Sequence, residues 1–382
     1  MLVATWAGGG NLPPLLSVAR VLADQGYAVR VLTSTATGEA AKAAGLEVVP
    51  YRRSPQPDTT VTFESHAAAF MAAAAGPEIA SEVRDSVSRW RPRLLVADCM
   101  LPAALAGGKA TGTPTASVVH FLYGPARERI ASGSGWTTDF RQLNLTRVVL
   151  GLVPLAHPIE AWEEPELVLV TAPRWFDHAA DFPPHVVHAG PLGIRSPPPS
   201  DRESGSDGAG RRVLIGFSTT AMPGQLEVVQ AVCEACDLAG VAATLTLGPA
   251  IDAGSIRAPA SVTVVPFAAH DEVLHTCAAV ITHAGLGTTL RAIAHSVPQL
   301  MLPLGRDQHI NAARVAELGA GIVLAAQSPP AAIAAALVKL LDDDRFRAAA
   351  AAAAVRIEAE DPDATAVAAL GRVGALIQGP GG

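Results

Sequence analysis

Residues 281–321 read ITHAGLGTTLRAIAHSVPQLMLPLGRDQHINAARVAELGAG, and this stretch decides the fold. An apolar strand runs into THAG, and GLGTT at 285–289 then turns into a helix. Glycines let the backbone approach a ligand closely, and the amides at a helix start attract anions. His283 and the hydroxyl of Thr288 are expected to face the same point. The stretch predicts a phosphate site, although a glycine-rich strand–helix turn with a capping threonine and no ligand would have the same sequence pattern.

A polar pair follows in the second part of the same stretch. After the apolar run QLMLPL at 299–304, GRDQ places Asp307 and Gln308 at the end of the next strand, where another helix begins. Asp307 could be only a helix N-cap, a common role for aspartate. A carboxylate accepts hydrogen bonds from hydroxyl groups, and an amide both donates and accepts them. The pair therefore also suits a sugar held beside the phosphate.

Short apolar runs alternate with helical patterns along both halves of the chain. Examples are LVATWA, AVRVLTS, LLVADC and TASVVHF in the first half, and RVLIGFS, AATLTLG and VTVVPF in the second. This alternation is typical of parallel βαβ units. It predicts an α/β protein of two Rossmann-like domains facing across a cleft, with ligands at the carboxyl ends of the strands.

The chain is expected to divide at SPPPSDRESGSDGAGRR, which is rich in proline, serine, glycine and charge. We place the first domain at 1–196, the linker at 197–211, and the second domain, with the phosphate site, at 212–360. Residues 361–382 form a helix and tail that could pack back on the first domain. The less regular stretch from Ala126 to Glu163 could carry helices that border a pocket.

The composition argues against several classes of function. The chain has 382 residues and a net charge of −7 without a basic block, so we expect no nucleic acid partner. No run reaches the roughly 18 uninterrupted apolar residues of a membrane span, and MLVATWAGGG lacks the basic start of a signal peptide. Four cysteines are too few for a disulfide framework, and Cys233 and Cys236 lie within a helical pattern. We expect a reduced, cytoplasmic setting.

We also expect neither a metal ion nor a resident cofactor. The longest carboxylate run, Asp342-Asp343-Asp344, falls between helical patterns and suits a cap or a solvated turn. GGG after the first strand could suggest a dinucleotide-binding oxidoreductase. That fold needs an acidic residue at the end of the second strand to hold a ribose, whereas this strand ends LTSTA at 32–36.

The stretch at 281–321 resembles the donor-binding signature of family-one GT-B glycosyltransferases, particularly the bacterial enzymes that decorate natural products. The domain order agrees with that family over nearly the whole chain. The resemblance implies that the first domain binds an acceptor and the second a nucleotide sugar. It assigns His283, Gly285, Gly287 and Thr288 to the diphosphate, and Asp307 and Gln308 to the sugar.

Two shorter segments resemble further parts of that donor site. VPFAAHDEVLHTC at 265–277 is similar to the segment that meets the nucleobase, which places Pro266 and Phe267 beside the base. GFSTT at 216–220 is similar to the first turn of the donor domain, which places Ser218 and Thr219 near the diphosphate and the reacting carbon.

The acceptor side departs from the family. The resemblance implies a histidine base in the first strand–helix turn, three residues before a proline, but the matching residue is Asn11. An amide has no useful basicity, so Asn11 is expected to position the substrate or to cap the helix. Asp98, at the end of LLVAD, could hold Asn11 or take the acceptor proton itself. His120, at the end of TASVVH, is an alternative base or a residue of the pocket wall.

These residues together predict an inverting, metal-independent glycosyltransferase. It would move a sugar, such as a deoxysugar, from a dTDP- or UDP-sugar to a small natural-product acceptor by O- or C-transfer. An aromatic polyketide is a suitable acceptor, since a phenol needs only modest help from a base. Two alternatives stay open: a catalytically silent homologue that activates a partner enzyme, and a sugar-nucleotide epimerase or hydrolase. A homodimer is also left open.

Overall fold

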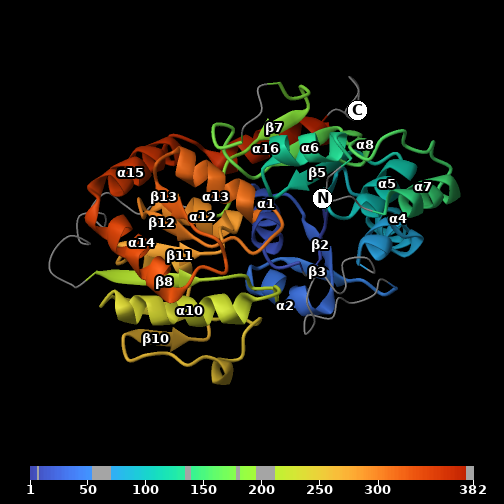
Figure 1. Cartoon of the computed structure of the whole chain (residues 1–382). Helices are drawn as coiled ribbons and strands as arrows, with labels where there is room; N and C mark the ends of the chain where they lie inside the picture. The colour runs from blue at the N-terminus through green and yellow to red at the C-terminus, as the bar shows by residue number, and fades with distance from the viewer. Residues whose placement is uncertain (7, 54–69, 134–138, 178–180, 195–210, 376–382) are drawn as a thin grey trace. The chain divides into compact units, whose positions relative to one another are not determined.

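The computed structural model describes residues 1–6, 8–53, 70–133, 139–177, 181–194 and 211–375. Most of the expected linker, the start of the helical pattern from Glu64 and the last residues of the tail lie outside this described part. The described chain forms two compact units (Figure 1). Unit 1 holds the described residues of Met1–Asp58, Glu64–Gly193 and Asp361–Gly382, and unit 2 holds those of Ile194–Glu360.

Unit 1 is built on a parallel sheet of seven strands in the order β3-β2-β1-β4-β5-β6-β7. The order reverses between β1 and β4, the position where sheets of this kind bind ligands. Its strands are β1 Leu2–Ala4, β2 Arg30–Thr33, β3 Glu47–Pro50, β4 Leu95–Asp98, β5 Thr115–Val119, β6 Leu167–Val170 and β7 Val186–His188.

Alternate residues of each strand point to opposite faces of the unit 1 sheet, and helices cover both faces. Val3, Val96 and Val118 share one apolar core with the helices α1 and α16. On the other face, Gly108 of α5 lies against Leu95. The helices are α1 Leu12–Asp24, α2 Thr35–Ala43, α4 Pro77–Trp90, α5 Pro102–Ala110, α6 Tyr123–Ala131, α7 Phe140–Val149, α8 Glu160–Glu163 and α16 Pro362–Ala375.

The last helix, α16, belongs to unit 1 although the chain reaches it from unit 2. It contacts α1, β5 and β6. Its buried face consists of Ala366, Ala369, Leu370 and Val373, all of which join the core below α1. Apolar residues at intervals of three and four positions give this face its helical spacing.

Unit 2 repeats the same plan with a parallel sheet of six strands in the order β10-β9-β8-β11-β12-β13. The reversal here falls between β8 and β11, so the turns after these two strands lie side by side at the carboxyl edge. The strands are β8 Arg212–Gly216, β9 Ala242–Thr246, β10 Val262–Val265, β11 Ala279–Thr282, β12 Gln299–Met301 and β13 Gly321–Val323.

Helices α10 and α14 of unit 2 pack against each other, and so do α12 and α15 (Figure 1). The helices are α10 Gln225–Leu238, α11 His270–Leu274, α12 Leu286–Ala294, α13 Gln308–Glu317, α14 Pro330–Asp342 and α15 Asp344–Glu358, with a short 3₁₀ turn at Ala253–Ser255. Cys233 and Cys236 are buried, free thiols on α10, as expected. Asp343 caps α15 by accepting a hydrogen bond from the amide of Arg345.

The α/β class and the repeated parallel sheets agree with the sequence prediction, and the differences are local. The stretch Ala126–Glu163 holds helices α6, α7 and α8 in its described part, which makes it more regular than its sequence indicates. Strand β13 was not predicted, because GIV is too short for a recognisable pattern. No helix in the described ranges combines the length and apolarity needed to cross a membrane.

Candidate functional site

The start of α12 has the geometry that the GLGTT stretch predicts. The first hydrogen bond of this helix runs from the Thr289 amide to the Gly285 carbonyl, at 2.9 Å. The amides of residues 286–288 precede that bond and lie outside the helical ladder, where they can bind an anion. Gly287 is exposed, and Gly285 and Thr288 are half-buried. This helix start is therefore accessible to a ligand and has backbone amides outside the helical ladder that can donate hydrogen bonds to it.

His283 lies directly against this helix start. A Cβ atom added at Gly285 would sit 2.6 Å from the Nε2 of His283, so only glycine leaves room for the ring. Burial lowers the pKa of His283 to about 4, a hydrogen bond with the Gly216 backbone opposes the shift, and the Arg306 charge adds to it. The imidazole is therefore neutral at pH 7. A neutral imidazole has one N–H group, which the ring can give either to the Gly216 backbone or to a phosphate oxygen.

The side chain of Asn311 connects the turn that is predicted to bind phosphate with Asp307, which is predicted to bind the sugar. Its fully buried side-chain amide donates to the Ala284 carbonyl at 3.0 Å and to the Asp307 carboxylate at 2.9 Å. Asp307 stands at the N-cap position of α13, but its side chain makes no capping bond. Side-chain capping is therefore wrong for Asp307, whose half-buried carboxylate is held beside the turn after β11.

Gln308 is less available to a ligand than the sequence indicates. Its Oε1 accepts hydrogen bonds from the amides of Leu304 at 2.7 Å and Gly305 at 3.1 Å. The residue is 3% exposed. The carbonyl oxygen therefore holds the loop between β12 and α13, and the amide nitrogen is what Gln308 can offer to a sugar hydroxyl.

The turn after β8 meets the loop after β12. The hydroxyl of Ser218, which is buried, lies 3.0 Å from the Thr220 hydroxyl, and Thr220 in turn accepts from Nη1 of Arg306 at 3.1 Å. Thr219 is exposed beside Gly248. The structure therefore brings the segments of Ser218, His283 and Asp307 to one edge of the sheet.

His270 is a member of this edge that sequence reasoning missed. Its Nε2 lies 3.2 Å from the Thr246 hydroxyl and its Nδ1 lies 3.5 Å from the Thr288 hydroxyl. Burial and the nearby Arg291 lower the pKa of His270, whereas Asp271 raises it. The ring orients Thr288 at the helix start. A signal was available, because His270 lies within the predicted base-binding segment 265–277, where the helical run HDEVL begins.

Pro266 and Phe267 lie at the end of β10, in the same unit. Both are exposed, and Phe267 has 81% of its surface accessible. The Pro266 carbonyl accepts a hydrogen bond from the Gly248 amide at 3.0 Å. A large aromatic ring left in solvent is able to stack on a planar ligand. Its assignment to the nucleobase stays a prediction.

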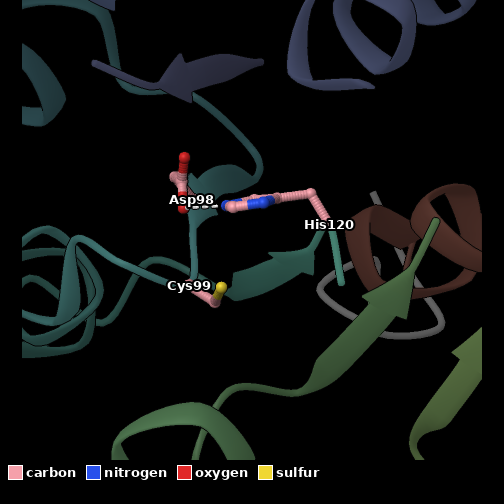
Figure 2. Close-up of side chains that lie close together, drawn as sticks. All are labelled: Asp98, Cys99 and His120. Carbon is pink, nitrogen blue, oxygen red and sulfur yellow. Dashed lines mark hydrogen bonds and ion pairs between the residues drawn. The ribbon is translucent and has the colours of Figure 1, made fainter. Parts of the chain in front are cut away.

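In unit 1, Asn11, Asp98 and His120 come together at the carboxyl edge of the sheet. Nδ2 of Asn11 donates to Oδ2 of Asp98 at 2.7 Å and to the Trp6 carbonyl at 3.1 Å. Nε2 of His120 lies 3.1 Å from Oδ1 of Asp98, as Figure 2 shows. Asn11 stands at the N-cap position of α1 but makes no side-chain capping bond. The capping interpretation of Asn11 is therefore wrong.

Asp98 is the centre of this cluster and has no direct access to solvent. It is 0% exposed, and Oδ1 also accepts from the Met100 amide at 2.9 Å. Oδ1 of Asn11 is buried and lacks a hydrogen-bond partner among the described residues. The His120 side chain is 12% exposed. Access from outside is therefore greater at the imidazole than at the carboxylate.

Cys99 lies next to Asp98 and His120, and the three side chains are close enough to share a metal ion. Burial raises the pKa of the Cys99 thiol well above its ordinary value, and the charge of Asp98 adds to the shift. A metal would require the thiolate and free carboxylate lone pairs. The Asp98 oxygens are already hydrogen-bonded, so this arrangement suits a proton-handling pair better than a metal centre.

Comparison with known proteins first matches the second half of the chain. Residues 239–371 match the family model described as Erythromycin biosynthesis protein CIII-like, C-terminal domain. Tylactone mycaminosyltransferase of Streptomyces fradiae is 34% identical over 139 residues, which is 36% of this chain and 30% of that protein. Elloramycin glycosyltransferase ElmGT of Streptomyces olivaceus is 50% identical over 66 residues, 17% of each chain. The matched segments thus span less than a third of these relatives.

Solved structures match over almost the full length. The glycotransferase of kitacinnamycin has a TM-score of 0.78 and 22% identity, covering 96% of both chains. Glycosyltransferase VinC in complex with dTDP has a TM-score of 0.75 and 21% identity, covering 98% of this chain and 99% of VinC. The chain therefore has the GT-B fold. Its resemblance to GT-B glycosyltransferases of natural-product pathways is confirmed.

Proposed function

We propose that the chain is a glycosyltransferase that moves a sugar from a dTDP- or UDP-sugar to a small natural-product acceptor. Unit 2 binds the donor, and unit 1 activates the acceptor. The observation that carries this proposal is the α12 helix start. Free amides, a neutral His283 and the Asp307 carboxylate, joined by Asn311, lie together there. Similarity to named glycosyltransferases of antibiotic pathways supports the same conclusion.

The donor site favours departure of a diphosphate without a metal ion. Negative charge grows on the diphosphate as the bond to the sugar breaks. Helix-start amides are fixed donors that stabilise such charge without reorganising, and the N–H of His283 adds to them when the ring does not give it to the Gly216 backbone. Asp307 accepts hydrogen bonds from sugar hydroxyls, and the amide nitrogen of Gln308 donates to them. The acceptor oxygen attacks the anomeric carbon from the opposite face, so the transfer inverts its configuration.

On the acceptor side we assign the base to His120 rather than to Asp98. An ionised carboxylate only accepts hydrogen bonds, so the Nε2 of His120 carries the proton in the contact with Asp98. The neutral ring then has its basic nitrogen at Nδ1. Asp98 orients the ring and stabilises the imidazolium that forms when the acceptor proton is taken. Asn11 supports Asp98 from the other side.

The acceptor class rests on chemistry and on the relatives. An aromatic polyketide with a phenol releases its proton more readily than an alcohol does, so the half-buried, restrained base suffices. Carbon attack from the ring position beside the phenol would need the same proton transfer. The relatives named for tylactone and elloramycin support a natural-product acceptor.

A transfer assay tests the proposal. The purified chain is incubated with dTDP- and UDP-sugars and a panel of phenolic polyketides, and products are followed by mass spectrometry. We expect an acceptor product heavier by one sugar residue, with equimolar release of the nucleoside diphosphate, and His283→Ala should lose most of this activity. Release of the sugar into water alone would favour the hydrolase alternative.

The same protein samples distinguish an active glycosyltransferase from the catalytically silent alternative. Asn11 is the feature that favours it, because the expected histidine is missing there. A silent protein would give no product, and its effect would appear only when a partner glycosyltransferase is added. Turnover by the chain alone, lost in His120→Ala, would contradict a silent role.

A further inference from the structure

We propose that unit 1 binds a small organic anion in a cavity at the amino edge of its sheet. The cavity has a volume of about 430 Å³, which lies within the range of ordinary ligand sites. Its lining comes from the segments that lead into β1, β2 and β4 and from the last turns of α16. Asn11, Asp98 and His120 lie at the opposite, carboxyl edge, and the donor residues lie in unit 2. The site is therefore additional to the proposed function and does not depend on it.

The cavity carries positive charge. Arg30, Arg91 and Arg93 line it, and none of the described residues that line it is acidic. Arg30 is balanced by Glu47, whose carboxylate accepts a hydrogen bond from its Nε at 2.7 Å. Arg91 and Arg93 are exposed and form no ion pair with any residue in the described part of the chain. Two guanidinium groups can therefore hold the oxygens of a carboxylate or phosphate.

Helix ends explain only part of this charge. Both α1 and α4 end at this edge, and a basic residue in the last turn of a helix is stabilised by the free carbonyl groups there. That role suits Arg89, in the last turn of α4. Arg93 lies beyond the C-cap of α4, in the segment before β4, and the helix effect is confined to the last turn. A bound anion accounts for the arginine at this position.

The backbone at Arg91 is held in a conformation that favours glycine. Arg91 is the C-cap residue of α4, with a φ of +46° and a ψ of 56°, in the left-handed region. Helices commonly end in this conformation on glycine, which has no Cβ atom to cause strain. Strain of this kind is concentrated at functional sites. The conformation therefore supports a role for the Arg91 side chain beyond ending the helix.

The rest of the lining suits a ligand with a flat apolar body. Apart from the three arginines, no described residue of the lining has a charged side chain. The half-buried ring of Trp90 lies 5.3 Å from Cζ of Arg30. On the α16 side, a Cβ atom added at Gly374 would lie 3.9 Å from Cε of Met1. An aromatic carboxylate or aromatic phosphate combines the ring that Trp90 can contact with the charge that the arginines require.

Titration calorimetry with phenyl phosphate, benzoate and benzyl alcohol tests this site. We expect the two anions to bind, and benzyl alcohol, which is neutral, to bind about tenfold or more weakly. Arg91→Gln and Arg93→Gln should each weaken phenyl phosphate binding about tenfold, because each removes a charge-assisted hydrogen bond. Arg84→Gln changes an exposed arginine of α4 outside the cavity, so it should leave the affinity unchanged. Binding of only one anion would identify the acid group that the site prefers.

Two further variants separate binding from folding. Gly374→Leu places a side chain in the cavity beside Met1 and introduces a better helix former. Its thermal midpoint should not fall, while phenyl phosphate binding is lost. Arg91→Gly relieves the backbone strain, so its midpoint should equal or exceed the wild-type value although binding is weakened.

His283→Ala separates this site from the donor site, since it changes unit 2 alone. It should bind phenyl phosphate as the wild-type chain does, even if the proposed function fails. Loss of binding in His283→Ala would place the probe at the start of α12 and overturn the inference. Equal affinity in the wild-type chain, Arg93→Gln and Gly374→Leu, or no binding of either anion to the wild-type chain, would also overturn it.

Discussion

Asn11 occupies the position where the resemblance to GT-B enzymes leads one to expect a histidine base. The structure places its amide against the Asp98 carboxylate, at 2.7 Å, and His120 contacts the same carboxylate from β5. An amide can fix a carboxylate but cannot take a proton near neutral pH. A histidine therefore does contact Asp98, but it comes from the end of β5 and not from the turn that holds Asn11.

His120→Ala tests whether His120, and not the residue at position 11, acts as the base. If His120 is the base, turnover should fall by roughly two to four orders of magnitude while nucleotide binding is unchanged. Imidazole added to the assay should restore part of the lost rate. The loss should also shrink as the acceptor phenol becomes more acidic, since a weaker base then suffices.

Asp98→Asn provides the matched comparison. An amide cannot stabilise the imidazolium, so the rate should fall, but imidazole should not rescue it because the His120 ring still fills its place. A loss in His120→Ala that is equal for all phenols, with no rescue by imidazole, would mean that His120 is structural.

His283 makes the stability of the fold depend on pH. Its pKa is about 4 in the folded chain, against an ordinary value of 6.5, because the ring is buried. Between these values the unfolded chain binds a proton that the folded chain does not. The free energy of unfolding therefore falls as the pH drops through this window, by roughly 3 kcal/mol, and the contribution is complete above pH 6.5.

Urea unfolding at pH 7.5 and pH 4.5 measures this effect. His283→Gln should lose less stability between the two pH values than the wild-type chain does. His270, whose pKa is also lowered, contributes in the same direction in both proteins. An identical pH dependence in the two proteins would show that the ring is not buried in its neutral form.

Single residues were predictable where the strand–helix pattern alone decides their place. His283 ends a strand before a glycine-rich turn, so its position followed from local sequence. The side-chain carbonyl of Gln308 accepts hydrogen bonds from the amides of Leu304 and Gly305. These bonds depend on how the loop before Gln308 folds back, which the sequence does not reveal. Asn311 was missed because its partner Ala284 is distant in sequence.

At the scale of elements, the turn between β11 and α12 depends on glycine for a specific reason. A Cβ atom at Gly285 would collide with the His283 ring, whereas one at Gly287 would meet only the flexible tip of Arg291, at 3.4 Å. Ala284, just before, has a φ of +65°. The close approach of ring and helix start is therefore built into the backbone of this turn.

Gly285→Ala should displace the His283 ring from the helix start. We expect dTDP affinity to fall about tenfold or more, which corresponds to ~1.4 kcal/mol. Gly287→Ala should cause a smaller loss, because the arginine tip can move away. Fluorescence titration with dTDP measures both variants, and unchanged affinity in Gly285→Ala would show that His283 does not contact the nucleotide.

Most elements were predictable because their patterns are long and periodic. Strands β8 and β11 are apolar runs, and α12 follows at once with residues of one face buried. Strand β13 was missed because its three residues, Gly321–Val323, show no period. Its pairing with β12 supplies the stabilisation that the short sequence does not reveal.

At the scale of the molecule, two sheets that share the same order over six strands carry two different polar clusters. Each cluster lies at the reversal of strand order, the position where sheets of this kind bind ligands. The repeated fold was predictable from the alternation of strands and helices. The sequence allowed α16 to pack on the first domain but did not require it, because Ala366, Ala369 and Leu370 would suit any apolar surface.

A crystal structure of the chain with dTDP tests the donor site at the start of α12 directly. We predict that diphosphate oxygens lie within about 3.2 Å of the amides of residues 286–288 and of the His283 ring, with the base against Phe267. A diphosphate bound elsewhere on the chain, with the start of α12 left to solvent, would contradict this assignment of the donor site.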